Sequence, residues 1–238
     1  YFVLPADEQL ELLAFCQDKL GRTVPLLEKD TWVVWTLSKL FSAEYGKHLT
    51  FKGGTSLSKA YGVINRFSED IDLTVDIRHL LPELTKGGNT LPPSNSQERK
   101  WTDQVKDALP KWIAKQIVPH LQEELGKDEI EANVRQVDDK VYLAYPPLEG
   151  GEDYVKPAVF LEFGARATGE PNQPMPVRCY MADAQVLGVS FPSANPIVMK
   201  IERTFWEKAT AAHVFCLQDR LRGERYARHW YDLVRIAS

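Results

Sequence analysis

Two aspartates, Asp70 and Asp72, lie two positions apart in a segment that is otherwise mostly apolar. Side chains two apart in a β-strand point to the same face, so a strand here presents both carboxylates together and buries the apolar residues between them. Carboxylates about 6–7 Å apart along a strand can bind one divalent ion or a close pair. Mg²⁺ takes one or two protein carboxylates and completes its shell with water and substrate phosphates. The pair therefore predicts a Mg²⁺ (or Mn²⁺) site that handles phosphates; the alternative is a solvated strand.

A glycine turn precedes this pair, at Gly53, Gly54 and Thr55. Glycine permits backbone conformations that other residues avoid, Thr55 can cap a helix, and amides at a helix N-terminus can bind a phosphate. Ser68, just before the aspartates, can donate a further hydrogen bond. Strand, turn, helix and acidic strand in this order predict a nucleoside triphosphate site beside the metal ligands. The simpler alternative is a tight turn.

Glu162 is the one acidic residue in the apolar stretch 158–163. A lone carboxylate in such a run is costly to bury unless it is paired or binds a metal. We therefore expect Glu162 to act as a third metal ligand or as a base. An edge strand that points Glu162 at water, or an ion pair with Arg166, would explain it equally simply.

Lys208 falls in the middle of the apolar face of a helix predicted from residue 197. Its ammonium group can reach a nucleotide phosphate as a mobile point charge, or its stem can cover apolar surface while the charge reaches water. Asp232 also lies among apolar residues, and it could hold Lys208 by a salt bridge. Arg203 can contact phosphate or pair with Glu207 one helical turn away.

The elements that position these residues predict an α+β fold with a mixed β-sheet. Helices fill the first 50 residues, one of them capped at Asp30, and the chain is again helical from residue 196. Between them we expect strands over 48–52, 71–77 and 158–163, a hairpin over 129–145, a helix over 99–125 interrupted near two prolines, and irregular structure over 171–196. We expect a catalytic domain with N-terminal helices over 1–190, joined to a helical region over 191–238 that is truncated.

The bulk composition limits the partners. The 238 residues carry a net charge of −4 and no membrane-length apolar run, and three widely separated cysteines favour a reducing cytoplasm. An acidic protein must contact nucleic acid through a local basic patch. The candidate patch consists of Arg220, Arg222, Arg225, Arg228, His229 and Arg235, unless these residues only form a solvated helix face.

Two motifs, KGGTSLSKAYG at 52–62 and RFSEDIDL at 66–73, resemble the AbiEii/AbiGii nucleotidyltransferase toxins of the polymerase-β-like superfamily. ERTFWEK at 202–208 and RHWYDL at 228–233 resemble later motifs of that family, so the resemblance covers about 50–235, with 86–125 as an insertion.

The resemblance implies a polymerase-β-like nucleotidyltransferase core with a helical C-terminal half. It implies four catalytic residues, with Lys208 also touching the triphosphate: Asp70, Asp72, Lys208 and Asp232. It further implies a toxin of a toxin–antitoxin or phage-defence pair that transfers a nucleotide from an NTP to the 3′ end of tRNA, encoded beside a cognate antitoxin. The alternatives are a small-molecule or protein acceptor, a glycosyltransferase that uses a UDP-sugar, and a non-catalytic interaction module.

Overall fold

The computed structural model describes residues 1–66, 68, 70–86, 88, 90–149, 156–217 and 225–238. The helices, in chain order, are α1 (Ala6–Leu20), α2 (Val24–Ser42), η1 (Glu44–His48), α3 (Gly53–Lys59), α4 (Ile77–Leu80), α5 (Asn95–Trp112), the π-helical η2 (Ile113–Ile117), α6 (Val118–Lys127), η3 (Tyr180–Ala184), α7 (Ile201–Cys216) and α8 (Arg225–Ala237). The strands are β1 (Leu49–Lys52), β2 (Asp70–Val75), β3 (Asn133–Val137), β4 (Lys140–Ala144), β5 (Ala158–Gly164), β6 (Asn172–Pro174), β7 (Val177–Arg178), β8 (Ser193–Ala194) and β9 (Ile197–Met199).

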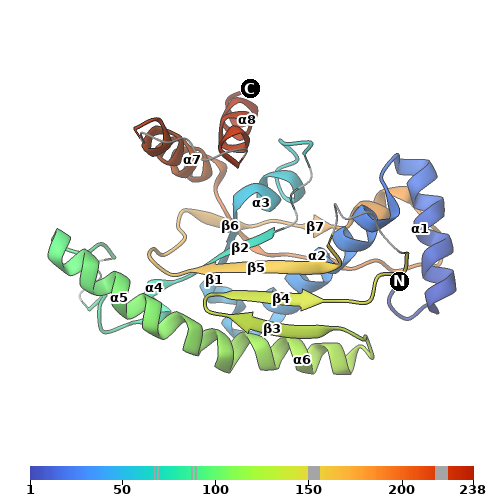
Figure 1. Cartoon of the computed structure of the whole chain (residues 1–238), viewed down its shortest axis with the longest axis horizontal. Helices are drawn as coiled ribbons and strands as arrows, with labels where there is room; N and C mark the ends of the chain where they lie inside the picture. Colours follow the sequence, from blue (N-terminus) through green and yellow to red (C-terminus); the bar gives the residue numbers. More distant parts are fainter. Residues whose placement is uncertain (67, 69, 87, 89, 150–155, 218–224) are drawn as a thin grey trace.

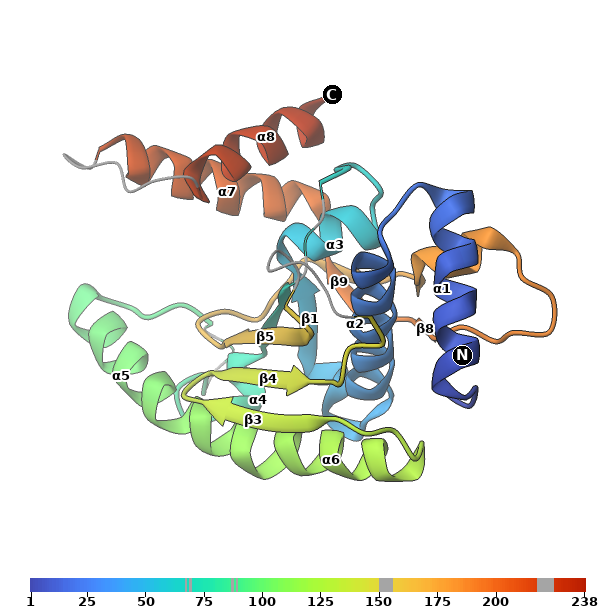
Figure 2. The ribbon, with the colours of Figure 1, turned by 45° about the vertical axis from the view of Figure 1, so that its right-hand side comes forward.

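Within these residues, seven strands form one mixed sheet in the order β3-β4-β5-β2-β1-β9-β6. Strand β2 lies at its centre, antiparallel to β1 and parallel to β5. The long helical segment α5–η2–α6 runs past the β3 edge, whereas α7 and α8 lie together near α3 at the opposite end of the molecule (Figures 1 and 2). The predicted α+β class with a mixed sheet is therefore confirmed.

The alternation of side chains in β2 positions the acidic pair as expected. Ile71, Leu73 and Val75 are buried in the core, and Asp70 and Asp72 lie on the opposite face, partly exposed. The two carboxylates therefore project from the centre of the sheet, where neighbouring strands can supply further groups.

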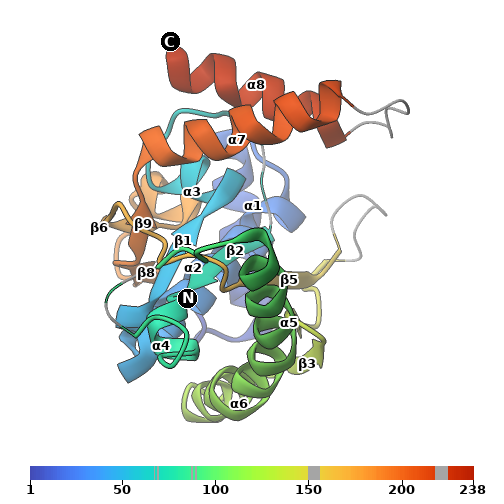
Figure 3. The same cartoon turned by 90° about the vertical axis from the view of Figure 1, so that its left-hand side faces the viewer.

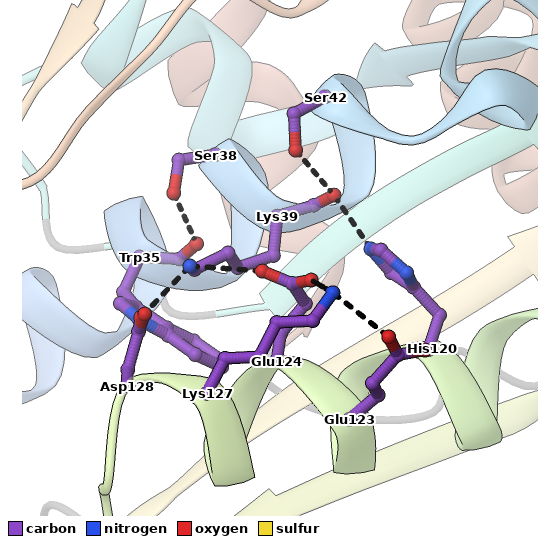
Figure 4. Close-up of polar contacts among 9 residues, drawn as sticks. All are labelled: Trp35, Ser38, Lys39, Ser42, His120, Glu123, Glu124, Lys127 and Asp128. Carbon is purple, nitrogen blue, oxygen red and sulfur yellow. Dashed lines mark hydrogen bonds and ion pairs between the residues drawn. The ribbon is translucent and has the colours of Figure 1, made fainter.

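Helix α2 is fastened to α6 by a polar network around Lys39 (Figure 4). The Lys39 Nζ lies 2.9 Å from Glu124 Oε2 and 2.8 Å from Asp128 Oδ2. Trp35 Nε1 donates to Asp128 Oδ2 at 2.7 Å, and His120 Nε2 lies 3.0 Å from the Lys39 carbonyl oxygen. These contacts hold the helical layer together on the side of the sheet away from α7.

Two expectations about the elements are wrong. Asp30 does not cap a helix: α2 begins at Val24, and Asp30 is buried inside it, where it accepts hydrogen bonds from Lys59 Nζ at 2.7 Å and from the Tyr180 amide at 2.6 Å. The chain is also not helical directly from residue 196, because β9 pairs with β1 and β6 in the main sheet. The boundary predicted near residue 190 stays a prediction.

Glu28 provides a prediction about stability and pH. It is 3% exposed, and burial raises the pKa of its carboxyl to about 7; the Leu148 amide opposes this by donating a hydrogen bond at 3.1 Å. The folded protein therefore holds this proton more tightly than the unfolded chain, and stability falls as pH rises from about 4.5 to about 7. Glu28→Gln should stabilise the protein at pH 8 by up to about 3 kcal/mol, and by less at pH 5.

Denaturant unfolding at the two pH values measures this difference. Glu11→Gln, at an exposed position of α1, is the control and should show no pH-dependent change. Equal effects of Glu28→Gln at pH 5 and pH 8 would contradict the prediction.

Candidate active site

The carboxylates belong to a row of residues that crosses neighbouring strands. Lys52 of β1 is the register partner of Asp72, and Asp72 is the register partner of Glu162 on β5. Glu162 is paired in the same way with Lys140 of β4. Backbone pairing therefore places Asp72 between a cation on one side and a second carboxylate on the other.

Glu162 lies in the interior of the sheet but is exposed, since the face of β5 that carries it is open. The argument from burial is thus wrong for this residue. The alternative is wrong in placing Glu162 on an edge strand and right in pointing it at water. No ion pair joins Glu162 to Arg166 among the residues that the structure describes. Its position beside Asp72 agrees with a role as a third ligand or a base, which stays a prediction.

The Asp72 carboxylate lies close to two other carboxylates, those of Glu162 and Asp70, and both burial and these charges change its pKa. Burial raises the pKa of Asp72 to about 6, and the charges of Glu162 and Asp70 add to this effect. Lys52 and Lys208 act in the opposite direction without cancelling it. A cation bound here would relieve this repulsion.

The residues fit a hard divalent ion. No group of three or more acidic, histidine or cysteine side chains is gathered closely enough to form a complete metal site in the described part of the chain. Mg²⁺ does not need one, because one or two carboxylates suffice when water and substrate phosphates complete the shell. Asp70 and Asp72 supply such oxygens, and Glu162 lies next to them.

Glycine is required at both positions of the turn at the start of α3. Gly53 has a φ of 79°, and a Cβ there would collide with the Asp72 carboxylate. A Cβ on Gly54 would lie 2.7 Å from both Arg66 Nη2 and Ser68 Oγ. The backbone amides at the start of α3 consequently lie directly beside the predicted metal ligand.

Thr55 does not cap the helix as expected, because α3 begins at Gly53 and Lys52 occupies the cap position. The Thr55 hydroxyl donates to the Asp70 carbonyl oxygen at 2.5 Å, and its oxygen lies 3.0 Å from Ser68 Oγ. Thr55 thus ties the glycine turn to the first residue of β2. Its predicted contact with phosphate stays a prediction, as does that of Ser68.

Gly53→Ala should reduce nucleotide transfer by about a hundredfold or more, since small displacements at a reacting centre cost rate on this scale. The added methyl group would push the Asp72 carboxylate out of position and would also strain the backbone. Gly62→Ala is a matched control: its φ is 65°, but nothing lies within 4 Å of the added Cβ. Both variants should lose stability in thermal unfolding because of the positive φ, Gly53→Ala more than Gly62→Ala because of the collision with Asp72, and only Gly53→Ala should lose activity. Equal activities would contradict the role given to the turn.

Asp232 is fully buried and accepts from two cations. Arg66 donates to it through Nε at 2.9 Å and Nη2 at 2.7 Å, and Lys208 Nζ lies 2.8 Å from Asp232 Oδ2. Burial alone would raise the pKa of Asp232, but these hydrogen bonds and charges lower it below its ordinary value. The predicted salt bridge between Lys208 and Asp232 is therefore present.

The separate motifs meet at a cavity of about 220 Å³. Its walls come from β1, the glycine turn, β2, α7 and α8, and its lining residues are Lys52, Gly53, Gly54, Asp72, Thr204, Glu207, Lys208 and His229. Figure 3 shows α7 crossing above β1 and β2 at this end of the sheet. The glycine turn, one predicted metal ligand and the C-terminal lysine thus share one small space.

Two other expectations concern Arg203 and the basic patch, and the contact of that patch with nucleic acid stays a prediction. Arg203 Nε donates to Glu207 at 3.3 Å, and Lys52 Nζ donates to the same carboxylate at 3.1 Å, so Arg203 is paired within its own helix. Of the proposed basic patch, residues 220 and 222 lie outside the described residues. Arg235 donates through Nε to the Val63 carbonyl oxygen at 2.9 Å.

Two residues of the site were not predicted to lie there: Arg66 had no assigned role, and His229 was expected only in the basic patch. Arg66 lies against the glycine turn and holds Asp232, and only its position in the RFSEDIDL motif could have indicated this. His229 lines the cavity, and its Nδ1 is buried with no hydrogen-bond partner among the residues that the structure describes. Burial, followed by the charge of Lys208, lowers the pKa of His229. Its place in the RHWYDL motif is the sequence signal that could have indicated this position.

Paired carboxylates beside a glycine turn and a lysine form a site of the class that handles nucleotides. The sequence model of the nucleotidyl transferase AbiEii toxin family, of type IV toxin–antitoxin systems, matches residues 35–238. The match covers most of the chain, so the protein belongs to this family, which confirms the resemblance seen in the motifs.

Among solved structures, MenT4, the nucleotidyltransferase toxin Rv2826c from Mycobacterium tuberculosis H37Rv, is similar with 18% sequence identity and a TM-score of 0.44. The match covers 88% of this chain and 59% of the MenT4 chain, so this chain spans less than two thirds of that protein. The comparison with curated proteins gives no match. In the described residues, no helix is long and apolar enough to cross a membrane.

Proposed function

We propose that this protein transfers a nucleoside monophosphate from an NTP to the 3′ end of tRNA, as the cytoplasmic toxin of a toxin–antitoxin pair with a cognate antitoxin. The observation that carries the proposal is the small cavity in which the glycine turn, Asp72 and Lys208 meet. It joins the groups needed to hold a triphosphate to a carboxylate suited to a metal ion. Family membership supplies the context of a toxin.

The triphosphate is held from two directions in this proposal. The amides at Gly53 and Gly54 donate hydrogen bonds to phosphate oxygens, and Ser68 adds a hydroxyl. Lys208 supplies a positive charge from α7, and the buried Asp232 fixes its position. The cations and amides together neutralise the charge that develops on the leaving pyrophosphate.

The reacting groups are aligned on β2 and β5. Asp70, Asp72 and Glu162 would hold Mg²⁺ or Mn²⁺, with water and substrate phosphates completing the shell. The ion would neutralise phosphate charge and make the acceptor hydroxyl more acidic. Glu162 also lies where it can accept the proton of that hydroxyl. The acceptor oxygen forms a bond to the α-phosphorus, the bond to the β-phosphate oxygen breaks, and pyrophosphate leaves. Positioning and charge neutralisation provide most of the rate enhancement.

Incubation of the protein with each α-labelled NTP, Mg²⁺ and total RNA tests this function. We expect label in tRNA with one or more of the nucleotides, at its 3′ end after nuclease mapping, and none when EDTA is added. Label only in protein or in small molecules would show a different acceptor and would overturn the tRNA assignment. No label in any fraction, with a correctly folded protein, would overturn the transferase assignment itself.

A further inference from the structure

A second, larger cavity opens beside the first and has no role in the triphosphate site. Its volume is about 600 Å³, within the range of ligand pockets in general. It lies over β5 and is walled by α5 and by the turn between β3 and β4. Lys52 and Glu207 line both cavities, so the two spaces adjoin at the row that contains Asp72 and Glu162.

We propose that this larger cavity binds the end of the acceptor polynucleotide, with Lys106 and Arg166 holding its phosphates. The inference rests on the proposed function and assigns the acceptor side of the same site. It is carried by the order of groups across the sheet, by the charges of the cavity and by its continuation along α5.

The order of Lys52, Asp72 and Glu162 across the sheet indicates which cavity takes the NTP and which takes the acceptor. In an in-line displacement the attacking and leaving oxygens lie on opposite sides of the phosphorus. Lys208 and the glycine turn place the pyrophosphate in the small cavity, on the β1 side of Asp72. The attacking hydroxyl must then come from the β5 side, where Glu162 lines the larger cavity.

The charges of the larger cavity suit a phosphate chain. Lys106 on α5 and Arg166 after β5 are both exposed, and neither forms an ion pair with any described residue. Lys52, in contrast, is already paired with Glu207. Lys106 and Arg166 are therefore the cations of this cavity that have no ion-pair partner among the described residues, and an arginine is well suited to phosphate.

The other walls suit the rest of a nucleotide. Pro110 of α5 and Ala167 after β5 are partly exposed and provide an apolar surface for a base, backed by the buried Val105 and Leu109. Asp138 and Asp139, at the β3–β4 turn, can only accept hydrogen bonds when ionised, so they suit the hydroxyl groups of a ribose and repel phosphate. The phosphates should consequently follow the wall that carries Lys106 and Arg166.

The cavity also continues beyond the length of one nucleotide. Lys106 lines an adjoining open depression of about 570 Å³ along α5, together with Arg99, the polar Asn95 and Thr102, and the acidic Glu98 and Asp103. A small-molecule acceptor would leave this second space empty, whereas a polynucleotide can follow α5 away from the reacting centre. This continuation favours a strand end over a metabolite.

The test measures binding and turnover separately with Lys106→Gln, Arg166→Gln and the double variant. Fluorescently labelled unfractionated tRNA is titrated with each protein without NTP, and transfer rates are measured against tRNA and NTP concentration. Charge-assisted contacts of this kind are worth about tenfold each, so the double variant should raise the Kd and the KM for tRNA by tenfold or more. The KM for NTP should change by less than about twofold, and the salt dependence of tRNA binding should weaken.

Lys111→Gln is the matched control, because Lys111 is an exposed lysine on the same helix that lines neither cavity. Unchanged tRNA binding and KM in the double variant, a rise in the KM for NTP instead, or no binding of tRNA by the wild-type protein would each overturn the inference. If tRNA binds and depends on both cations but no nucleotide is transferred, the proposed function fails and the binding site stands. If transfer occurs but is indifferent to both cations, the binding site fails and the proposed function stands.

Discussion

Replacing Asp72 with asparagine should reduce nucleotide transfer by about a thousandfold or more, because a metal-dependent centre loses both charge neutralisation and substrate alignment. Asparagine has nearly the same shape, so the protein should still fold. Burial and the charges of Glu162 and Asp70 already hold the pKa of Asp72 at about 6. Removing the charge therefore relieves repulsion, and without a divalent ion the variant should unfold at the same temperature as the wild type or higher.

Two measurements check this prediction: the rate of label transfer from NTP, and thermal unfolding with and without Mg²⁺. Wild-type protein should gain stability from Mg²⁺, since a ligand that binds only the folded state raises its stability, whereas Asp72→Asn should gain much less. Asp18→Asn, at an exposed position of α1, is the control and should behave like the wild type. A folded Asp72→Asn protein that retains full transfer would show that the site is wrong.

Replacing Asp232 with alanine should cause the largest loss of stability among the changes considered. Asp232 is fully buried and holds both Arg66 and Lys208. Removing one partner of a buried ion pair typically costs about 3–5 kcal/mol, because the remaining charge is left without compensation. The variant should also lose transfer activity below its unfolding temperature, since Lys208 is no longer held beside the glycine turn.

Lys208→Met separates the loss of stability from the loss of transfer activity. It removes the cation that faces the phosphate but leaves Asp232 paired with Arg66. Denaturant unfolding should therefore show a smaller loss of stability than in Asp232→Ala, while the loss of transfer and the rise in the KM for NTP should be at least as large. If Lys208→Met were destabilised as much as Asp232→Ala but kept its activity, the lysine would have a purely structural role.

The sequence predicted those parts of the site that follow from short-range periodicity. Asp70 and Asp72 share one face because side chains alternate in a strand, and β2 confirms this. Lys208 and Asp232 stood out because each is charged within an apolar pattern, and the structure joins them. Such residues can be identified without knowing which elements are neighbours.

The parts that failed depend on contacts distant in sequence. Glu162 looked buried because its run is apolar, yet the exposure of a central strand depends on what covers each of its faces. Asp30 looked like a helix cap, but Lys59 reaches it from the end of α3. Strand β9 has three residues, Ile197 to Met199, and so short an apolar run does not distinguish a strand from the start of the following helix. Pairing with β1 and β6 decides it.

The two strands that carry the carboxylates are adjacent in the sheet but far apart in the chain. The chain that connects the end of β2 to the start of β5 contains α5, α6 and the β3–β4 hairpin. The spacing of Asp72 and Glu162 follows from the hydrogen-bond ladder, which keeps neighbouring strands about 4.8 Å apart. It does not depend on the length of the chain segment that connects β2 to β5. The intervening segment can therefore change in length or sequence without changing the spacing of the two carboxylates.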